Sequence, residues 1–121
     1  MVQYTAHEII GGYYCKDTKV MVTRKLARMP YAQAGVLVDA RGVHLISYST
    51  LVCTVDPEGW LTCTGTYSAT TRKHIGAFMK EFSTPCGYYD AKRCYEKDEA
   101  LNIYTGEVMS LADYARMVGA A

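Results

Sequence analysis

The chain has 121 residues, and half of them are apolar, which suits one domain built around one hydrophobic core. A formal net charge of +1 excludes a strong overall field that would draw the whole protein to nucleic acid or to a membrane surface. The N-terminal residues lack a basic region followed by an apolar run, so we expect neither export nor membrane insertion. Residues 1–121 are predicted to form a single cytosolic domain.

Five cysteines are an odd number, and none of them stands in a CxxC pair. In a reducing cytosol their expected role is that of small buried hydrophobic residues. A zinc site needs clustered cysteine and histidine ligands, which this spacing does not offer. We therefore predict no bound metal and no cofactor.

The first predicted strand is KVMVTR, residues 19–24, with Val20 and Val22 turned inward. The next segment, KLARMPYAQA, contains Pro30 and is predicted to be a loop or a short helix.

Residues 35–49, GVLVDARGVHLISYS, alternate in the manner of a β-hairpin. Gly42 suits the bulge position of a type I turn, which would place Asp39 opposite Val43. In that register one face holds Val36, Val38, His44, Ile46 and Tyr48, and the other holds Leu37 and Leu45. Because both faces carry apolar residues, we expect this pair of strands to be covered at least partly on both sides.

The next hairpin is predicted in LVCTVDPEGWLTCTG, residues 51–65. The DPEG turn suits a type I turn with a bulge, which sets Asp56 opposite Trp60 and Cys53 opposite Cys63. The shared apolar face would consist of Leu51, Cys53, Val55, Leu61 and Cys63. The facing cysteines are interpreted as two packed thiols rather than as a redox pair.

After residue 66 the apolar period changes from two to 3.6 residues, which predicts an amphipathic helix. Its apolar stripe comprises Ile75, Phe78, Met79 and Phe82. Either Thr70 or Thr71 is expected as the N-cap, and the helix must end before STPCG, where proline and glycine stop it.

The C-terminal third gives weaker signals. DAKRCYEKDEA, residues 90–100, is charged and expected to be exposed, with no assigned form. NIYTGEVM, residues 102–109, is predicted to be a small hairpin that turns at Thr105 and Gly106. Ser110, with Asp113 three residues on, resembles a capping arrangement and predicts a short final helix. The apolar face of that helix would hold Leu111, Tyr114, Ala115 and Val118.

These elements together predict an α+β fold. An antiparallel β-meander of about four to five strands would carry one amphipathic helix packed on a face, and a short C-terminal helix would close the chain. The exposed edges of so small a sheet, together with many tyrosines, favour a homo-oligomer.

No stretch carries a catalytic signature, because there is no glycine-rich phosphate loop, no GxSxG and no HExxH. The three histidines lie far apart in sequence, and His44, in mid-strand, is better interpreted as a satisfied half-buried residue than as a general base. We therefore predict that the protein is not an enzyme and has no catalytic residues. An enzyme would need a deep pocket that joins His44 or His74 to a cysteine or an acid.

One stretch, YSATTRKHI, places cations where a helix favours anions. The first turn of a helix has free N–H groups and a partial positive charge, so Arg72 and Lys73 are unfavourable there unless an anion binds. The candidate residues for ligand or partner binding are therefore Tyr67, Ser68, Thr70, Thr71, Arg72, Lys73 and His74. The simpler interpretation, which the sequence alone favours, is a helix cap with Arg72 and Lys73 in water.

The chain contains eleven tyrosines but only two phenylalanines and one tryptophan. Tyrosine is common at binding surfaces because its ring is apolar while its hydroxyl stays hydrated. The pairs Tyr13–Tyr14 and Tyr88–Tyr89 lie beside glycines and are expected on loops. A small core completed with tyrosine is an equally good explanation.

Residues 47–82 resemble a short domain of unknown function found in small open reading frames of phages and mobile elements of Gram-positive bacteria. The pattern of that domain is SYxTxV, a variable hairpin, and GxYSxTTxxHIxxF. Its fixed positions are met by Ser47, Tyr48, Thr50, Val52, Gly65, Tyr67, Ser68, Thr70, Thr71, His74, Ile75 and Phe78. The resemblance defines residues 47–82 as a strand–hairpin–helix unit and implies a life in the cytosol of a bacterial host.

Small accessory proteins of that origin often act by binding. We therefore expect a non-enzymatic phage or mobile-element accessory protein that binds a host protein or a defence component, for example as an anti-CRISPR inhibitor. The alternative is a module that binds a phosphate-containing ligand or nucleic acid at the helix start, residues 68–74. Neither hypothesis involves a membrane.

Overall fold

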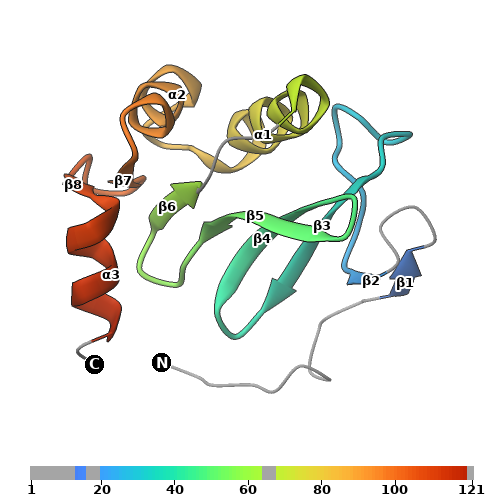
Figure 1. The fold of residues 1–121 in the computed structure, drawn as a ribbon, viewed down its shortest axis with the longest axis horizontal. Helices are drawn as coiled ribbons and strands as arrows, with labels where there is room; N and C mark the ends of the chain where they lie inside the picture. Colours follow the sequence, from blue (N-terminus) through green and yellow to red (C-terminus); the bar gives the residue numbers. More distant parts are fainter. Residues whose placement is uncertain (1–12, 16–19, 64–67, 120–121) are drawn as a thin grey trace.

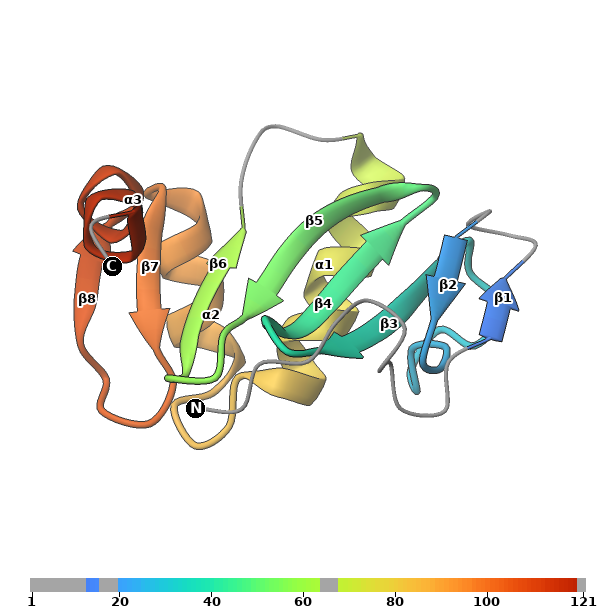
Figure 2. The same cartoon turned by 90° about the horizontal axis from the view of Figure 1, so that it is seen from below.

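The computed structural model of the protein describes residues 13–15, 20–63 and 68–119 (Figure 1). The main feature is a six-stranded antiparallel sheet in which the strands follow one another in chain order, as Figure 2 shows from one edge to the other. These strands are β3 (Ala34–Asp39), β4 (Gly42–Ser47), β5 (Thr50–Val55), β6 (Trp60–Cys63), β7 (Glu99–Asn102) and β8 (Val108–Ser110).

Two short strands, β1 (Tyr13–Cys15) and β2 (Val20–Val22), form a second antiparallel sheet. This sheet adjoins β3 through an isolated bridge between Arg24 and Val36. Val22 is fully buried, as predicted, whereas the side chain of Val20 lies outside the described residues. Residues 25–33 form bends and turns, so this segment is a loop and not the short helix that the sequence also allowed. The predicted α+β fold is confirmed, and the strands of the main sheet slightly exceed the predicted number.

Three helices complete the fold. Helices α1 (Ala69–Phe82) and α2 (Tyr88–Glu96) lie side by side on one face of the sheet, and α3 (Leu111–Gly119) lies on the other side, beside β7 and β8 (Figure 1). The main hydrophobic core fills the space between the sheet and the first two helices. From α1 it receives the predicted apolar stripe of Ile75, Phe78, Met79 and Phe82.

The β5–β6 hairpin has the predicted register. Cys53 lies opposite Cys63, and the Asp56 N–H donates to the Trp60 carbonyl oxygen at 3.0 Å. The two cysteines form a disulfide, so the interpretation as packed thiols is wrong. That interpretation depended on the expected compartment, whereas directly opposed positions bring the two Cα atoms to 4.3 Å, close enough for a bridge.

A β-bulge between β4 and β5 changes the face on which Leu51 lies. Leu45 pairs with Cys53 but Ile46 pairs with Leu51, so Val52 is an extra residue in β5. Val52 is buried, whereas Leu51 is 45 % exposed. The prediction that Leu51 shares the face of Cys53 is wrong, because an alternating apolar pattern does not reveal an inserted residue.

The β3–β4 hairpin differs from the prediction by one residue. Asp39 pairs with Gly42 rather than with Val43. As a result Leu37 and His44 face one side, while Val36, Val38 and Leu45 face the core beneath α1. The apolar pattern could not decide between the two registers because both faces of these strands carry apolar residues.

Gly42 serves a different purpose from the predicted bulge. Its φ is +125°, and a Cβ at this position would lie 2.1 Å from the carbonyl oxygen of Val55. The glycine is therefore required because β5 passes close to the backbone of β4.

The C-terminal elements are partly as predicted. β7 and β8 flank the turn at Thr105 and Gly106, and the Asp113 N–H donates to Ser110 Oγ at 3.0 Å at the start of α3. Helix α2 was not predicted, and its first residues are Tyr88–Tyr89. Tyr13–Tyr14 belongs to β1. The expectation that both tyrosine pairs lie on loops is therefore wrong.

Candidate functional site: a basic hollow along α1

Helix α1 begins earlier than the sequence suggested. Ser68 is the N-cap, since its hydroxyl accepts the Thr71 N–H at 3.2 Å. The choice of Thr70 or Thr71 as the cap is wrong, because the side chain of Thr71 is buried and that of Thr70 is exposed. The first turn contains no acidic residue, so no side-chain anion compensates the partial positive charge of the helix end.

His74 lies inside the protein rather than at the exposed helix start. It is 1 % exposed, and its Nδ1 lies 2.8 Å from Ser47 Oγ, which in turn lies 3.0 Å from Thr71 Oγ1. Burial and the charge of Lys25 lower the pKa of His74. The ring is therefore neutral at neutral pH and adds no charge to the helix start.

Tyr48 covers this buried polar group. Its backbone has φ 55° in the turn between β4 and β5, and its ring centroid lies 5.9 Å from that of His74. These contacts therefore connect the start of α1 to the end of β4, through the side chains of Ser47, Tyr48, Thr71 and His74. These four residues, which all belong to the quoted sequence pattern, have a structural explanation.

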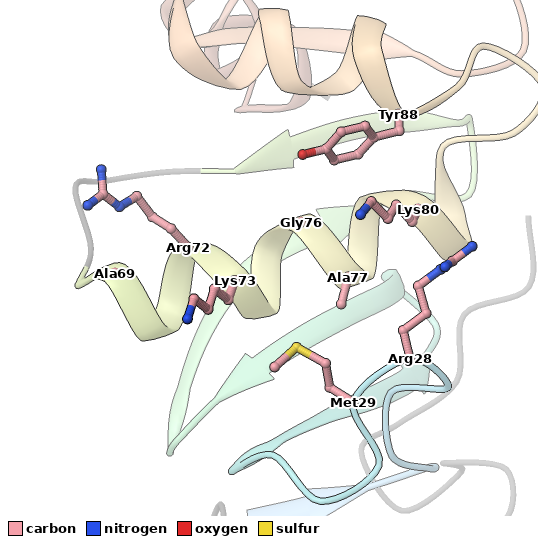
Figure 3. Close-up of a pocket in the computed structure, with 9 residues that line it drawn as sticks. All are labelled: Arg28, Met29, Ala69, Arg72, Lys73, Gly76, Ala77, Lys80 and Tyr88. Carbon is pink, nitrogen blue, oxygen red and sulfur yellow. The ribbon is translucent and has the colours of Figure 1, made fainter.

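The outer side of α1 borders a hollow of about 610 Å³, which we call the α1 hollow (Figure 3). Helix α1 forms its floor, the 25–33 loop contributes one side, and the start of α2 contributes the other. The lining residues are Arg28, Met29, Ala69, Arg72, Lys73, Gly76, Ala77, Lys80 and Tyr88.

The spacing of residues along α1 produces this floor. Arg72, Gly76 and Lys80 are four residues apart, so they stand in one row on the helix surface. Lys73 and Ala77 stand in the neighbouring row by the same rule. Two small residues therefore separate the cations at the start of the helix from the cation near its end.

Glu81 fixes the loop that supplies Arg28. Its carboxylate accepts the Ala27 N–H at 2.6 Å and pairs with the guanidinium of Arg24. That guanidinium also lies 5.2 Å from the centroid of the Phe82 ring. The loop is thus tied to α1 next to the hollow, which limits the positions that Arg28 can take.

The positive charge of the hollow is not compensated. All six arginines of the chain lie in the described residues, and four of them pair with a carboxylate. These four are Arg24, Arg41, Arg93 and Arg116. Arg28 and Arg72 have no such partner in the described part of the chain, and both line the α1 hollow. Since no aspartate or glutamate is among the lining residues, the hollow is basic although the net charge of the chain is only +1.

A second hollow of about 390 Å³ lies between α1 and α2. It shares Arg72, Gly76 and Tyr88 with the α1 hollow, so the two are parts of one groove. Its remaining polar lining residues are Lys92, Tyr95, Glu96 and Asp98. The groove is therefore basic along α1 and of mixed charge along α2.

Tyr88 is the aromatic residue of the groove. The ammonium nitrogen of Lys80 lies 5.0 Å from the centroid of its ring, and the ring of Tyr89 packs against it edge to face at 5.4 Å. Tyr89 itself is 82 % exposed. The groove thus offers aromatic surface next to its cations.

A second polar group lies on the opposite face of the sheet. Asp39 Oδ1 lies 2.7 Å from His44 Nε2, and His44 Nδ1 lies 2.8 Å from Thr54 Oγ1. An ionised carboxylate only accepts hydrogen bonds, so Nε2 carries a proton and donates it to Asp39. In a neutral ring Nδ1 then accepts the hydroxyl proton of Thr54.

This arrangement has the acid, base and hydroxyl order of nucleophilic enzymes, and a cavity of about 510 Å³ borders His44 and Thr54. Burial favours a higher pKa for Asp39, but the hydrogen bonds from His44 and from the Arg41 N–H outweigh it and lower the pKa. His44 is only 2 % exposed, and both of its ring nitrogens are occupied. We interpret the group as a structural link that holds β3, β4 and β5 in register.

The structure separates the seven residues predicted for the site. Among those that the structure describes, only Arg72 and Lys73 line the α1 hollow. Ser68 caps α1, Thr71 and His74 are buried, and Thr70 is exposed but does not line the hollow. Tyr67 lies outside the described residues. Three further lining residues, Arg28, Lys80 and Tyr88, were not predicted from the sequence. For Lys80 a signal was available, because it stands eight residues after Arg72 on the exposed side of the predicted helix.

In the described ranges, no group of three or more histidines, cysteines, aspartates and glutamates is placed to hold a metal ion. None of the helices in those ranges has the length and apolar character needed to cross a membrane.

Residues 16–99 match the model of a family of unknown function, DUF8033. The match covers more than half of the chain, so the protein belongs to this family. The matched range contains every residue that lines the α1 hollow. No curated protein and no solved structure is significantly similar to the chain. The family carries no assigned activity, so function must be argued from the site itself.

Proposed function

We propose that this protein is a non-enzymatic binding protein that recognises a phosphate-bearing ligand in the α1 hollow. One observation carries the proposal: the two arginines that lack a carboxylate partner in the described residues both line this hollow. Unpaired arginines are suited to phosphate because the planar guanidinium donates two parallel hydrogen bonds to its oxygens.

The position of the hollow at the start of α1 adds to this. An anion near Ala69 would meet the free N–H groups and the partial positive charge of the helix end. Arg72 and Lys73 would then be favourable rather than unfavourable at this place. Of the two hypotheses that the sequence left open, the hollow therefore favours the phosphate-bearing ligand.

The test is isothermal titration calorimetry with sodium tripolyphosphate as the probe. We expect the wild-type protein to bind, and the double variant Arg28→Gln, Arg72→Gln to bind about tenfold more weakly because two charge-assisted contacts are lost. Arg116→Gln, which changes an arginine on α3, is the matched control and should bind like the wild type. Equal affinities for all three proteins would refute the proposal.

Exposed tyrosines support a second candidate function, contact with a host or defence-system protein. Tyr31, Tyr89 and Tyr104 are 96 %, 82 % and 65 % exposed. Large exposed aromatic residues are typical of protein interfaces. On this proposal the chain acts in the cytosol of a bacterial host as a phage or mobile-element accessory protein, for example as an anti-CRISPR inhibitor.

This second candidate is tested by producing the protein in a bacterium whose CRISPR system blocks a phage, and counting plaques. Restored plaque formation that is lost in the variant Tyr31→Ser, Tyr89→Ser would support it. Plaque counts that stay at the blocked level with the wild-type protein would contradict an anti-CRISPR role.

A further inference from the structure

The cations of the α1 hollow stand at its two ends. Figure 3 shows Arg72 and Lys73 near the start of α1, and Lys80 and Arg28 near its end. Residues 72 and 80 are eight positions apart, which is about 12 Å along a helix. One phosphate group cannot reach both ends, whereas a chain with repeated phosphates can.

The floor between the two ends is open at Gly76. Among the described residues outside the helix's own backbone, only Tyr88 Oη lies within 4 Å of a Cβ built on this residue, at 3.9 Å, and no unusual φ requires glycine there. Glycine inside a helix is unfavourable, so neither packing against the described residues nor backbone geometry explains its presence. The missing side chain leaves room for a ligand in the part of the floor that both hollows share.

Each of the two segments that border the α1 hollow contains an exposed tyrosine outside the lining, Tyr31 and Tyr89. Tyr31 belongs to the same 25–33 loop as Arg28, and Tyr89 stands next to Tyr88 at the start of α2. Cations that follow a backbone, combined with aromatic rings on which bases stack, are the features by which proteins bind single strands.

The shape of the site does not suit a double helix. To read a duplex, an α-helix must project so that it can enter the major groove. Helix α1 instead lies between Tyr88 of α2 on one side and Arg28 and Met29 of the 25–33 loop on the other (Figure 3). A single strand can lie along a floor that is flanked in this way.

We infer that the phosphate-bearing ligand of the α1 hollow is a single-stranded nucleic acid. Its phosphates lie at the two cationic ends, its backbone passes over Gly76, and its bases stack on tyrosines beside the hollow. The inference rests on the proposed function, because it specifies the ligand class for the same site.

The experiment measures fluorescence anisotropy of a labelled oligothymidylate of about 16 nucleotides, the upper end of common single-strand site sizes. The competing probes are a duplex of the same length, a single-stranded RNA, sodium tripolyphosphate and polyglutamate. We expect the single strands, DNA or RNA, to bind at least tenfold more tightly than the duplex and polyglutamate. With four cations in contact, the logarithm of the binding constant should fall against the logarithm of salt with a slope of about −3.

Three variants locate the binding. Arg28→Gln with Arg72→Gln should lower the affinity and reduce the slope by about 1.4, since two phosphate contacts are lost. Gly76→Leu keeps the charge but fills the floor, so it should lower the affinity while the helix still forms. Arg116→Gln, on α3, should bind like the wild type. A thermal melt of each variant shows that it folds.

The outcomes separate this inference from the proposed function. If duplex or polyglutamate binds as tightly as the single strand, and the arginine variant still weakens binding, the inference is wrong and the hollow remains a general anion site. If single strands bind equally well to wild type and Gly76→Leu, the predicted path over Gly76 is wrong. If the arginine variant binds every probe like the wild type, the inference and the proposed function both fail.

Discussion

At the scale of single residues, Gly76 is a position where the stability of the helix favours alanine, whereas the proposed binding favours glycine. Glycine in a helix interior is about 1 kcal/mol less favourable than alanine, and the space around Gly76 accepts a Cβ. We therefore expect Gly76→Ala to raise the free energy of unfolding by about 1 kcal/mol, measured by urea denaturation.

Gly42→Ala is the matched control for this prediction. A Cβ at Gly42 would meet the Val55 carbonyl oxygen at 2.1 Å, so the same substitution there must lower stability. If Gly76→Ala also lowered the free energy of unfolding, the fold itself would need the glycine. The open space at Gly76 would then be a requirement of folding rather than room for a ligand.

His74 makes stability depend on pH in a defined range. Its pKa in the folded protein lies below the ordinary value of 6.5, because burial and the charge of Lys25 disfavour the protonated ring. Above about pH 6.5 neither the folded nor the unfolded chain holds the proton, so this residue adds no pH dependence. Below it, the unfolded chain binds a proton that the folded chain resists. Stability must therefore fall as the pH falls, until the folded pKa is reached.

We expect the free energy of unfolding to decrease as the pH falls below about 6.5, with a slope of at most about 1.4 kcal/mol per pH unit from this residue. Urea denaturation at several pH values measures it. The variant His74→Gln should be less stable overall but should show a smaller slope in this range. An unchanged slope in the variant would assign the pH dependence to other groups. Asp39, whose pKa is also lowered, contributes only at lower pH, where carboxylates become protonated.

At the scale of elements, the start of α1 can be tested through its cap. Ser68 Oγ accepts a backbone N–H, while the nearby Thr70 is exposed and has no capping role. Replacing an N-cap serine by alanine typically lowers stability by about 1 kcal/mol. We expect this loss for Ser68→Ala, and a change within about 0.5 kcal/mol for Thr70→Ala, in thermal or urea unfolding. A larger loss of stability for Thr70→Ala than for Ser68→Ala would instead support Thr70 as the N-cap, as the sequence predicted.

The elements also show which parts of the fold the sequence could predict. The β5–β6 hairpin was predictable because its DPEG turn and its apolar face agree on one register. The β3–β4 hairpin was not, since apolar residues on both faces leave two registers equally acceptable. Helix α2 was missed for a different reason: only the small residues Ala91 and Cys94 are buried in its nine residues, and most of the others are charged or tyrosine, so the segment lacks large apolar side chains.

The candidate site was predictable only in part. Arg72 and Lys73 were predictable because cations are unfavourable in the first turn of a helix unless an anion binds there, and both line the hollow. Arg28 and Tyr88 come from other segments, and only the packing of the 25–33 loop and α2 beside α1 brings them there. The net charge of only +1 hides the site as well, because the acids that balance its cations are not among the lining residues.

At the scale of the whole molecule, the α1 hollow and helix α3 lie on opposite sides of the sheet (Figure 1). The family match ends at residue 99, so β8 and α3 lie beyond it. None of the side chains of α3 is buried, and Tyr114 joins the helix to the β5–β6 hairpin. The hydroxyl of Tyr114 donates to Asp56 Oδ2, and its ring lies 6.1 Å from that of Trp60. Burial and the Asp56 carboxylate raise the pKa of Tyr114, which keeps the hydroxyl protonated as a donor.

Tyr114→Phe removes this hydrogen bond and keeps the ring against Trp60. We expect the amides of α3 to exchange hydrogen faster, by about fivefold for a loss of about 1 kcal/mol, while the amides of α1 exchange as before. Hydrogen exchange followed by mass spectrometry measures both. The turn that carries Asp56 should persist, since Oδ1 still accepts the N–H groups of Glu58 and Trp60 at 2.9 Å.

The same variant tests whether the two sides of the sheet are independent. Because Tyr114 and the α1 hollow share no residues, tripolyphosphate should bind to Tyr114→Phe as it binds to the wild type. If Tyr114→Phe also weakened binding, a structural change at α3 would be reaching α1 through the sheet. The hollow would then depend on α3 as well as on α1, α2 and the 25–33 loop. Unchanged binding together with faster exchange in α3 would show that these three elements are sufficient to form it.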